Sequence, residues 1–201
     1  MKQGIIKAIL AGFCIAIGGS VFLSCESKVV GALFFCVALL TICMFGFALF
    51  TGKVGFLAVS HTKTDLRDVL SSLIGNFIGC VFFGITIRIG LSKLIPVAQT
   101  ICDAKLTQNI AEAIIRAFFC GALMFIAVWI YREKKSISAI FFCVPAFILS
   151  GFEHSIANMF YFAVAGYFNI ESLLYIILIV LGNSLGGMFI PAFLKLCEEK
   201  K

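Results

Sequence analysis

Six stretches of the chain are apolar for long enough to cross a lipid bilayer, and this restricts the fold more than any other feature. A crossing α-helix needs about 20 predominantly apolar residues. The chain has 201 residues, and we predict crossings at about 5–23, 29–60, 69–91, 108–131, 136–167 and 173–196. With 62% hydrophobic and 13% charged residues, it has too little polar surface for a soluble globule. We therefore predict an all-α membrane protein, with residues 1–201 forming a single transmembrane domain.

Polar residues interrupt two of the six stretches. The run 29–60 is too long for one plain crossing and contains Leu49-Phe-Thr-Gly-Lys53, and the run 136–167 contains Gly151-Phe-Glu-His-Ser-Ile-Ala-Asn158. We predict that these second and fifth crossings are broken, each consisting of two half-helices joined by a loop. An ionisable residue at membrane depth is costly and indicates function by default. His154 is therefore the first candidate for a functional residue.

The two halves of the chain share a short motif that indicates an internal duplication. Ile74-Gly-Asn-Phe-Ile-Gly79 in the third crossing matches Leu181-Gly-Asn-Ser-Leu-Gly186 in the sixth. We predict one repeat over about 1–95 and a second over about 105–201. Because three crossings are an odd number, the second repeat enters the membrane from the opposite face. Such an inverted 3+3 repeat places a binding site near the midplane, between the two broken helices.

Basic residues predict the orientation. Ten of the sixteen lysines and arginines lie at the two termini, in a polar loop over 61–68, and in the segment 132–135. They are Lys2, Lys7, Lys63, Arg67, Arg132, Lys134, Lys135, Lys195, Lys200 and Lys201. Six crossings put all of them on one side, which the positive-inside rule makes the cytoplasm. The net charge of +6 reflects this bias and does not indicate nucleic-acid binding. We expect a multi-pass cell-membrane protein with cytoplasmic termini and an outer loop over 92–107.

The polar groups at the interruptions suit a small anion. An anion that enters hydrocarbon loses its hydration, so the pathway must supply donors such as half-helix N-termini, the Thr51 hydroxyl and the His154 imidazole. We expect His154 to be neutral in an empty pathway and to share or donate a proton when an anion arrives. Glu112 and Arg116, one helical turn apart, are expected to pair.

Three strings resemble the signatures of the formate/nitrite transporter family: Leu49-Phe-Thr-Gly52, Gly151-Phe-Glu-His-Ser-Ile-Ala-Asn-Met-Phe160 and Gly182-Asn-Ser-Leu-Gly-Gly187. The resemblance covers nearly the whole chain. It implies an aquaporin-like protomer in a homopentamer. Each protomer would conduct a small monovalent anion such as formate, nitrite or hydrosulfide, often together with a proton.

The resemblance also implies roles for individual residues. His154 matches the central histidine of the family, Thr51 its loop threonine and Asn183 its sixth-helix asparagine. The constrictions and the vestibule would be formed by Leu39, Phe50, Phe147, Phe35, Lys105 and Glu112. Residues with a structural role at the site would be Glu153, Asn158, Gly52 and Asn76. The chain departs from the pattern at Gly121, where some members have an asparagine, and this leaves the proton partner of His154 unassigned.

Other interpretations stay open at this point. His154, Thr51, Asn183 and the phenylalanines also suit a purely structural role, and Lys105 also suits a solvated loop. No motif for an enzyme, a metal or a cofactor is found. A pore for neutral solutes is disfavoured by the lack of paired Asn-Pro-Ala motifs, and a membrane thiol-redox protein by nine cysteines without a CxxC pair. The N-terminal run also fits a signal peptide ending near Cys25, although Gly18-Gly19 favours a retained helix.

Overall fold

A computed structural model describes residues 2–60 and 62–198, and within these ranges the ordered elements are all helical. Met1, His61 and residues 199–201 lie outside this description, as do the predictions that concern Lys200 and Lys201. The helices are α1 (Lys2–Ser24), α2 (Lys28–Phe45), α3 (Phe50–Lys53), η1 (Val54–Ala58), α4 (Lys63–Gly90), η2 (Ser92–Leu94), α5 (Ile95–Leu106), α6 (Ile110–Lys134), α7 (Ser138–Leu149), α8 (Ser155–Ala165) and α9 (Ile170–Glu198).

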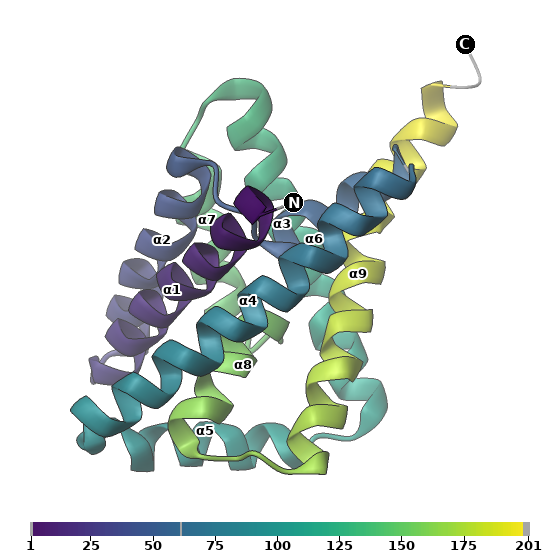
Figure 1. The fold of residues 1–201 in the computed structure, drawn as a ribbon. Coiled ribbons are helices and arrows are strands. Elements are labelled where there is room, and N and C mark those ends of the chain that lie inside the picture. The colour runs from purple at the N-terminus through teal and green to yellow at the C-terminus, as the bar shows by residue number, and fades with distance from the viewer. Residues whose placement is uncertain (1, 61, 199–201) are drawn as a thin grey trace.

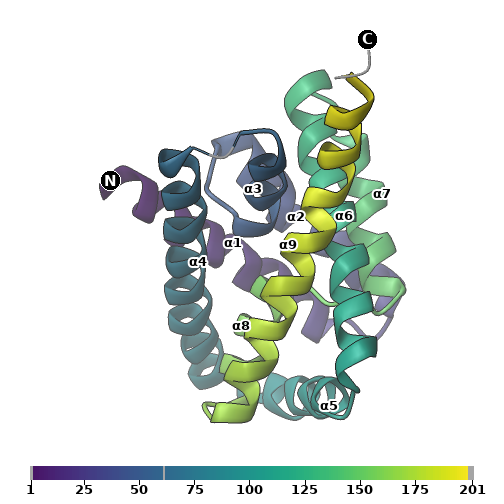
Figure 2. The ribbon, with the colours of Figure 1, turned by 90° about the vertical axis from the view of Figure 1, so that its right-hand side faces the viewer.

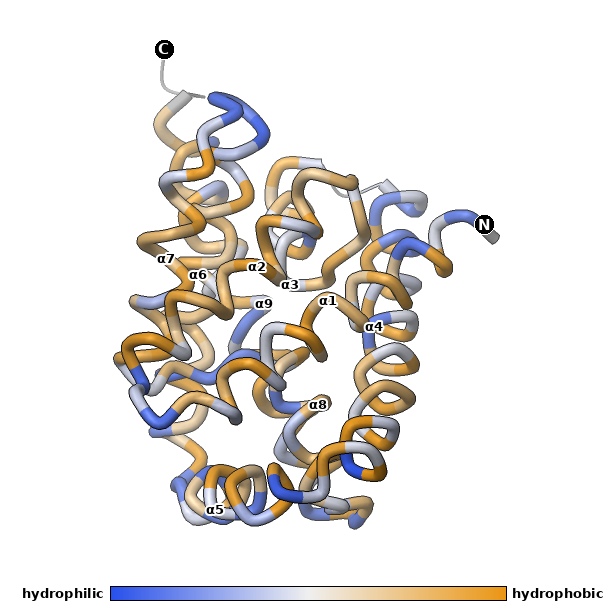
Figure 3. The backbone as a smooth tube through the Cα atoms, turned by 90° about the vertical axis from the view of Figure 1, so that its left-hand side faces the viewer, coloured by the Kyte–Doolittle hydropathy of each residue, from blue (hydrophilic) through white to orange (hydrophobic). Residues whose placement is uncertain are grey.

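Five described helices are long and apolar enough to cross a membrane: 3–24, 28–45, 63–90, 110–134 and 170–197. Two shorter apolar helices, α7 and α8, follow one another in the segment 138–165. Figure 3 shows that apolar residues extend along most of the length of these helices. Many large apolar side chains are exposed on the outside of the helix bundle, as expected for surfaces that face lipid or a partner protein.

Two predicted loops are wrong in part. The segment 92–107 was expected to be an outer loop, but it forms η2 and α5. Pro96 at the start of α5 explains why a helix begins there, since proline is well tolerated in the first helical turn. Residues 63–68, expected to belong to a polar loop, form the first turns of α4. Thr62 and Asp65 make a capping box that satisfies free backbone N–H groups at this end.

Close backbone contact between pairs of helices holds the bundle together. α1 packs most extensively on α4, and α6 packs on α9 (Figure 1). A Cβ atom at Gly12 in α1 would lie 2.7 Å from the carbonyl oxygen of Asn76 in α4. A Cβ atom at Gly121 in α6 would lie 2.1 Å from the carbonyl oxygen of Asn183 in α9. Both glycines therefore permit a helix approach that no larger residue allows.

The helix α5 lies across one end of the molecule. Figure 2 shows it beneath the long helices, while the start of α1 and the end of α9 lie toward the opposite end. The turn between α1 and α2 lies on the same side as α5, because Lys28 and Lys105 line one cavity. This end, which we call the α5 end, therefore carries the entrance to the site described next.

Candidate functional site

His154 begins α8 and caps it with its own side chain. The imidazole Nδ1 accepts a hydrogen bond from the backbone N–H of Ala157 at 3.1 Å. The other ring nitrogen, Nε2, lies 3.0 Å from the Thr51 Oγ1 atom. Because Nδ1 accepts, the proton of the neutral ring is on Nε2, which donates to Thr51. His154 is 2% exposed, so this arrangement is fixed within the protein interior.

Thr51 lies in the first turn of the short helix α3 and is fully buried. Its oxygen accepts the hydrogen bond from His154, so its own hydroxyl hydrogen is free to be donated elsewhere. The segment 151–154 and the segment 46–51, about a hundred residues apart in sequence, thus meet at a pair of polar side chains. This contact brings together the polar segments that interrupt the two long apolar runs of the sequence.

Two asparagines hold these segments in place from neighbouring helices. Asn76 in α4 accepts a hydrogen bond from the Phe50 N–H and donates to the carbonyl groups of Ala8 and Ala48, each at 2.8 Å. Such a bond network satisfies backbone groups that the start of a helix leaves free. Asn76 is fully buried, so these bonds replace water.

Asn183 in α9 does the same for α8. It accepts a hydrogen bond from the Ser155 N–H and donates to the carbonyl groups of Ala117 and Glu153, each at 2.8 Å. Asn183 is also fully buried. The side-chain oxygen and nitrogen of Asn76 and of Asn183 all bond to backbone groups, and neither residue lines the cavity. Both asparagines therefore hold the backbone on either side of the site in position.

Glu153 is a buried carboxylate with three side-chain donors. Lys105 Nζ lies 2.6 Å from Oε2, Gln108 Nε2 lies 2.9 Å from Oε1, and Asn158 Nδ2 lies 2.9 Å from Oε2. These donors are side chains of α5, the α5–α6 turn and α8. Lys105 is 14% exposed and Glu153 is 2% exposed. The positive charge of Lys105 is therefore neutralised inside the protein.

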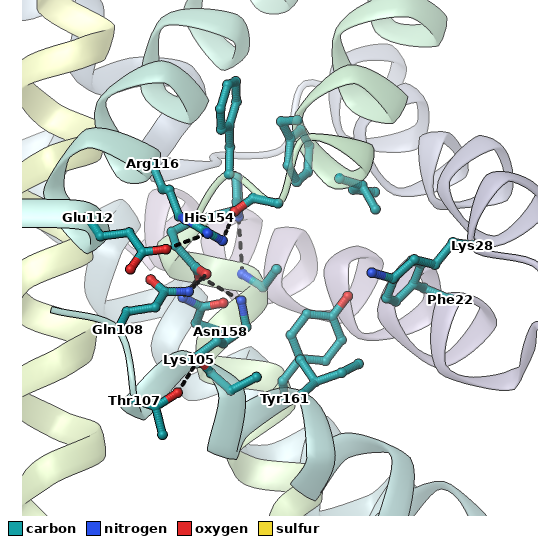
Figure 4. Close-up of a pocket in the computed structure, with 18 residues that line it drawn as sticks. Phe22, Lys28, Lys105, Thr107, Gln108, Glu112, Arg116, His154, Asn158 and Tyr161 are labelled. Atoms are coloured by element: carbon teal, nitrogen blue, oxygen red, sulfur yellow. Dashed lines mark hydrogen bonds and ion pairs between the residues drawn. The ribbon is translucent and has the colours of Figure 1, made fainter.

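A cavity of about 420 Å³ reaches from the α5 end to His154. Figure 4 shows its labelled lining residues, among them Lys28, Lys105, Arg116, Tyr161 and His154. The predicted pairing of Glu112 with Arg116 is present at its wall, and Arg116 also donates to the carbonyl oxygen of Gly151 at 3.2 Å. The imidazole thus faces an open space rather than lipid.

One phenylalanine ring is stacked on the imidazole, and a second contacts the first. Phe147, which also lines the cavity, is stacked on His154 with ring centres 5.5 Å apart and planes inclined by 23°. Phe35 meets Phe147 edge to face, with ring centres 6.3 Å apart. Leu39, Phe50 and Phe35 are all buried in the core and are absent from the cavity wall. Of the predicted constriction residues, Phe147 therefore lines the cavity, and the other three are buried away from it.

Two glycines of interest face neighbouring helices. A Cβ atom at Gly52 would lie 2.9 Å from Cγ2 of Val128 in α6. Gly121, where the family pattern suggested a missing polar partner for His154, points at the backbone of Asn183. A side chain at position 121 would have to displace α9, so the glycine serves helix packing.

Four polar residues near the site were not singled out from the sequence. Tyr161 and Gln108 line the cavity, and Tyr175 donates to Gln108 Oε1 at 3.1 Å. The Ser155 hydroxyl is fully buried and, among the described residues, has no hydrogen-bond partner. A signal existed for Tyr161 and Ser155: Tyr161 follows His154 by seven residues, or two helical turns, and Ser155 follows it directly.

Known proteins share both the sequence pattern and the fold. A sequence model described as "Formate/nitrite transporter" matches residues 1–197. The nitrite transporter NirC of Escherichia coli (strain K12) is 32% identical over 185 residues, which cover 82% of this chain and 68% of NirC. The formate channel FocA of Haemophilus influenzae is 25% identical over 180 residues, which cover 77% of this chain and 63% of FocA.

A solved structure titled "Pentameric formate channel with formate bound" has the same fold, with a TM-score of 0.83. It is 22% identical in sequence, and the match covers 100% of this chain and 98% of that one. The family match over nearly the whole length, together with the apolar helices, makes this chain a multi-pass membrane protein. The chain belongs to the formate/nitrite transporter family.

Proposed function

We propose that this protein carries small monovalent weak-acid anions, such as formate, nitrite or hydrosulfide, across the cell membrane, and that a proton accompanies the anion. The hydrogen bond between His154 and Thr51 at the end of the cavity carries this proposal. It places two neutral polar groups, both able to donate a hydrogen bond to a dehydrated anion, deep within the protein. The names of the relatives, a nitrite transporter and a formate channel, support the same substrate class.

The proposed architecture is a single domain of six crossings in two inverted halves, with residues 1–95 and 105–201 as the repeats. The helices α2 and α3, and likewise α7 and α8, would form the broken second and fifth crossings. The matching roles of Asn76 and Asn183 support this duplication, because each binds the start of one short helix. The pentameric formate channel with the same fold supports a homopentamer.

In the proposed pathway an anion enters the cavity from the α5 end and reaches the face of Phe147. It then moves past His154 to Thr51, and leaves between Phe50 and Leu39 toward the other side. The hydroxyl of Thr51 supplies a hydrogen bond without a fixed charge, and the Nε2–H group of His154 supplies a second one when the anion replaces Thr51 Oγ1 as its acceptor. A site without a fixed charge binds the anion weakly enough for it to leave.

Proton linkage places a further demand on the imidazole. With Nδ1 occupied by the Ala157 N–H, the ring holds a single proton, on Nε2. This proton can be donated in a hydrogen bond to the anion but cannot be transferred to it, because a neutral imidazole that loses its proton becomes an imidazolate. A doubly protonated ring would have to give up the helix cap. We propose that the accompanying proton comes from the water of the cavity, and that Nε2–H donates a hydrogen bond to the weak acid, which passes as a neutral species.

The proposed orientation puts the N- and C-terminal ends in the cytoplasm and the α5 end outside. The excess of basic residues in the segments 63–67 and 132–135 supports it. Under this orientation the cavity opens to the outside of the cell.

Transport in proteoliposomes tests the proposal. The experiment measures uptake of formate, nitrite and hydrosulfide at two pH values, while a pH-sensitive dye records external alkalinisation. His154→Asn is a suitable variant, because asparagine is a good helix cap and can still accept from the Ala157 N–H. We expect His154→Asn to assemble normally and to lose proton-linked uptake. Proton coupling of wild-type strength in this variant would falsify the role of the imidazole.

The same experiment separates the other interpretations. A pore for neutral solutes would show rapid glycerol or water flux, followed by light scattering, without anion uptake. A thiol-redox protein would catalyse disulfide exchange, a reaction that anion flux does not require. Either result without anion uptake would contradict the proposed function.

A further inference from the structure

The cavity contains a positive charge that the site described above does not use. Three basic residues line it: Lys28, Lys105 and Arg116. Lys105 is paired with Glu153, and Arg116 is paired with Glu112. Among the residues that the structure describes, Lys28 has no ion pair. The lining therefore carries one excess positive charge, and Lys28, the exposed first residue of α2, supplies it.

A second group in the same cavity lacks a partner. Tyr161 is 7% exposed, and its hydroxyl makes no hydrogen bond in the described part of the chain. Its ring is held by Phe22 of α1, with ring centres 6.3 Å apart, and by Phe160, with ring centres 5.7 Å apart. Because Tyr161 lines the cavity, a ligand or water there can accept a hydrogen bond from its hydroxyl.

The two groups face the same part of the cavity. In Figure 4 the Lys28 ammonium group and the Tyr161 hydroxyl point toward one another from α2 and α8, on the side away from Lys105 and Gln108. Tyr161 lies seven residues after His154, so about 10 Å of α8 separates the two along the helix axis. Asn158 lies between them and already donates to Glu153.

We propose that Lys28 and Tyr161 form an outer anion subsite, which captures a small monovalent anion before it reaches His154. This subsite depends on the anion transport proposed above, and Lys28 and Tyr161 would set the apparent affinity for the transported anion. The ammonium group draws the anion into the cavity, and the hydroxyl donates a hydrogen bond to it. Lys105, whose charge is neutralised by Glu153, holds the cavity wall in place and attracts the anion little.

The test compares formate uptake by Lys28→Gln, Tyr161→Phe and Lys93→Gln with that of the wild type. Lys93 is an exposed lysine of η2 outside the cavity lining, so its variant is a matched control for loss of one charge at this end. We expect Lys28→Gln to raise the half-saturating formate concentration about two- to five-fold at low salt, and less at high salt. Tyr161→Phe, which keeps the ring, should raise it about ten-fold. Maximal flux and proton coupling should stay unchanged.

Bromide provides a readout that does not depend on transport. In crystals of the protein grown with bromide, anomalous scattering should locate the ion between the Lys28 and Tyr161 side chains, and the peak should vanish in Tyr161→Phe. If the wild type carried no anion but bound bromide there, the transport proposal would fail and the subsite would stand. If Lys28→Gln and Tyr161→Phe matched Lys93→Gln in kinetics, or if bromide did not bind there, the subsite would be overturned.

Discussion

Asn183 binds the start of α8 with the same three kinds of hydrogen bond that Asn76 makes to the start of α3. Each asparagine accepts from the first N–H of a short helix, and each donates to a carbonyl two residues earlier and to a carbonyl in a neighbouring long helix. Ala8 and Ala117 are the partners in the long helices α1 and α6. His154 and Leu49, the residues just before the two short helices, therefore hold matching positions.

Replacing either asparagine should destabilise the protein. Asn76→Ala and Asn183→Ala each leave one backbone donor and two carbonyls without their partner in a buried place. We expect each to cost about 2–4 kcal/mol, which would appear as a lower melting temperature in detergent. Asn→Asp at the same positions keeps the acceptor but removes both donors, and should cost a similar amount. A melting temperature equal to that of the wild type for either alanine variant would contradict this account.

The ion pair between Lys105 and Glu153 should be strongly coupled. Lys105→Met leaves the 2% exposed carboxylate without its cation, and Glu153→Gln leaves the lysine without its anion. Either single change should destabilise the protein by about 3–5 kcal/mol. The double variant removes both charges and should recover much of the loss. A double-mutant cycle on thermal stability measures the coupling, and additive effects would show that the pair is unimportant.

The Thr51 hydroxyl should be needed for flux but not for folding. Thr51→Val keeps the shape and removes both the acceptor for His154 Nε2 and the free donor. We expect anion uptake to fall about ten-fold or more, as for loss of a hydrogen bond to a charged group. Thr51→Ser retains the hydroxyl and should retain most uptake. Equal uptake by the valine and serine variants would remove Thr51 from the pathway.

Gly121 should tolerate no side chain. The Cβ atom of Gly121→Ala would lie 2.1 Å from the Asn183 carbonyl oxygen, so α6 and α9 would have to separate. Such overpacking typically costs about 1–3 kcal/mol. Gly90→Ala is the matched control, because nothing lies within 4 Å of a Cβ atom there. Comparison of expression level and melting temperature checks the prediction, which fails if both variants behave alike.

Anion flux should survive the loss of all nine cysteines. The structure has them as free thiols, and Cys36 and Cys80 donate weakly to the carbonyl groups of Ile140 and Gly12 on neighbouring helices. Replacing all nine with alanine or serine should lower stability modestly and leave uptake in place. Loss of uptake in a variant that still assembles would favour the thiol-redox interpretation.

The sequence predicted the apolar helices and the family, because both depend on local composition and on short strings. It also predicted the Glu112–Arg116 pair, whose members are one helical turn apart. It missed α5, because a short helix of mixed polarity at the membrane surface has no long apolar run. It also missed the Lys105–Glu153 pair, since 48 residues separate the two and only the tertiary fold brings α5 beside α8.

The position of the imidazole at the start of α8 limits how the passage can open and close. A ring that swung aside to admit an anion would leave the Ala157 N–H without its acceptor, and loss of such a helix cap costs about 0.5–2 kcal/mol. We therefore expect the imidazole of His154 to stay in place while an anion passes. Phe147 touches it only through the flat side of its ring, so rotation of that phenyl group costs no hydrogen bond. In the proposed pathway we expect the phenyl ring of Phe147 to move and the imidazole of His154 to keep its position.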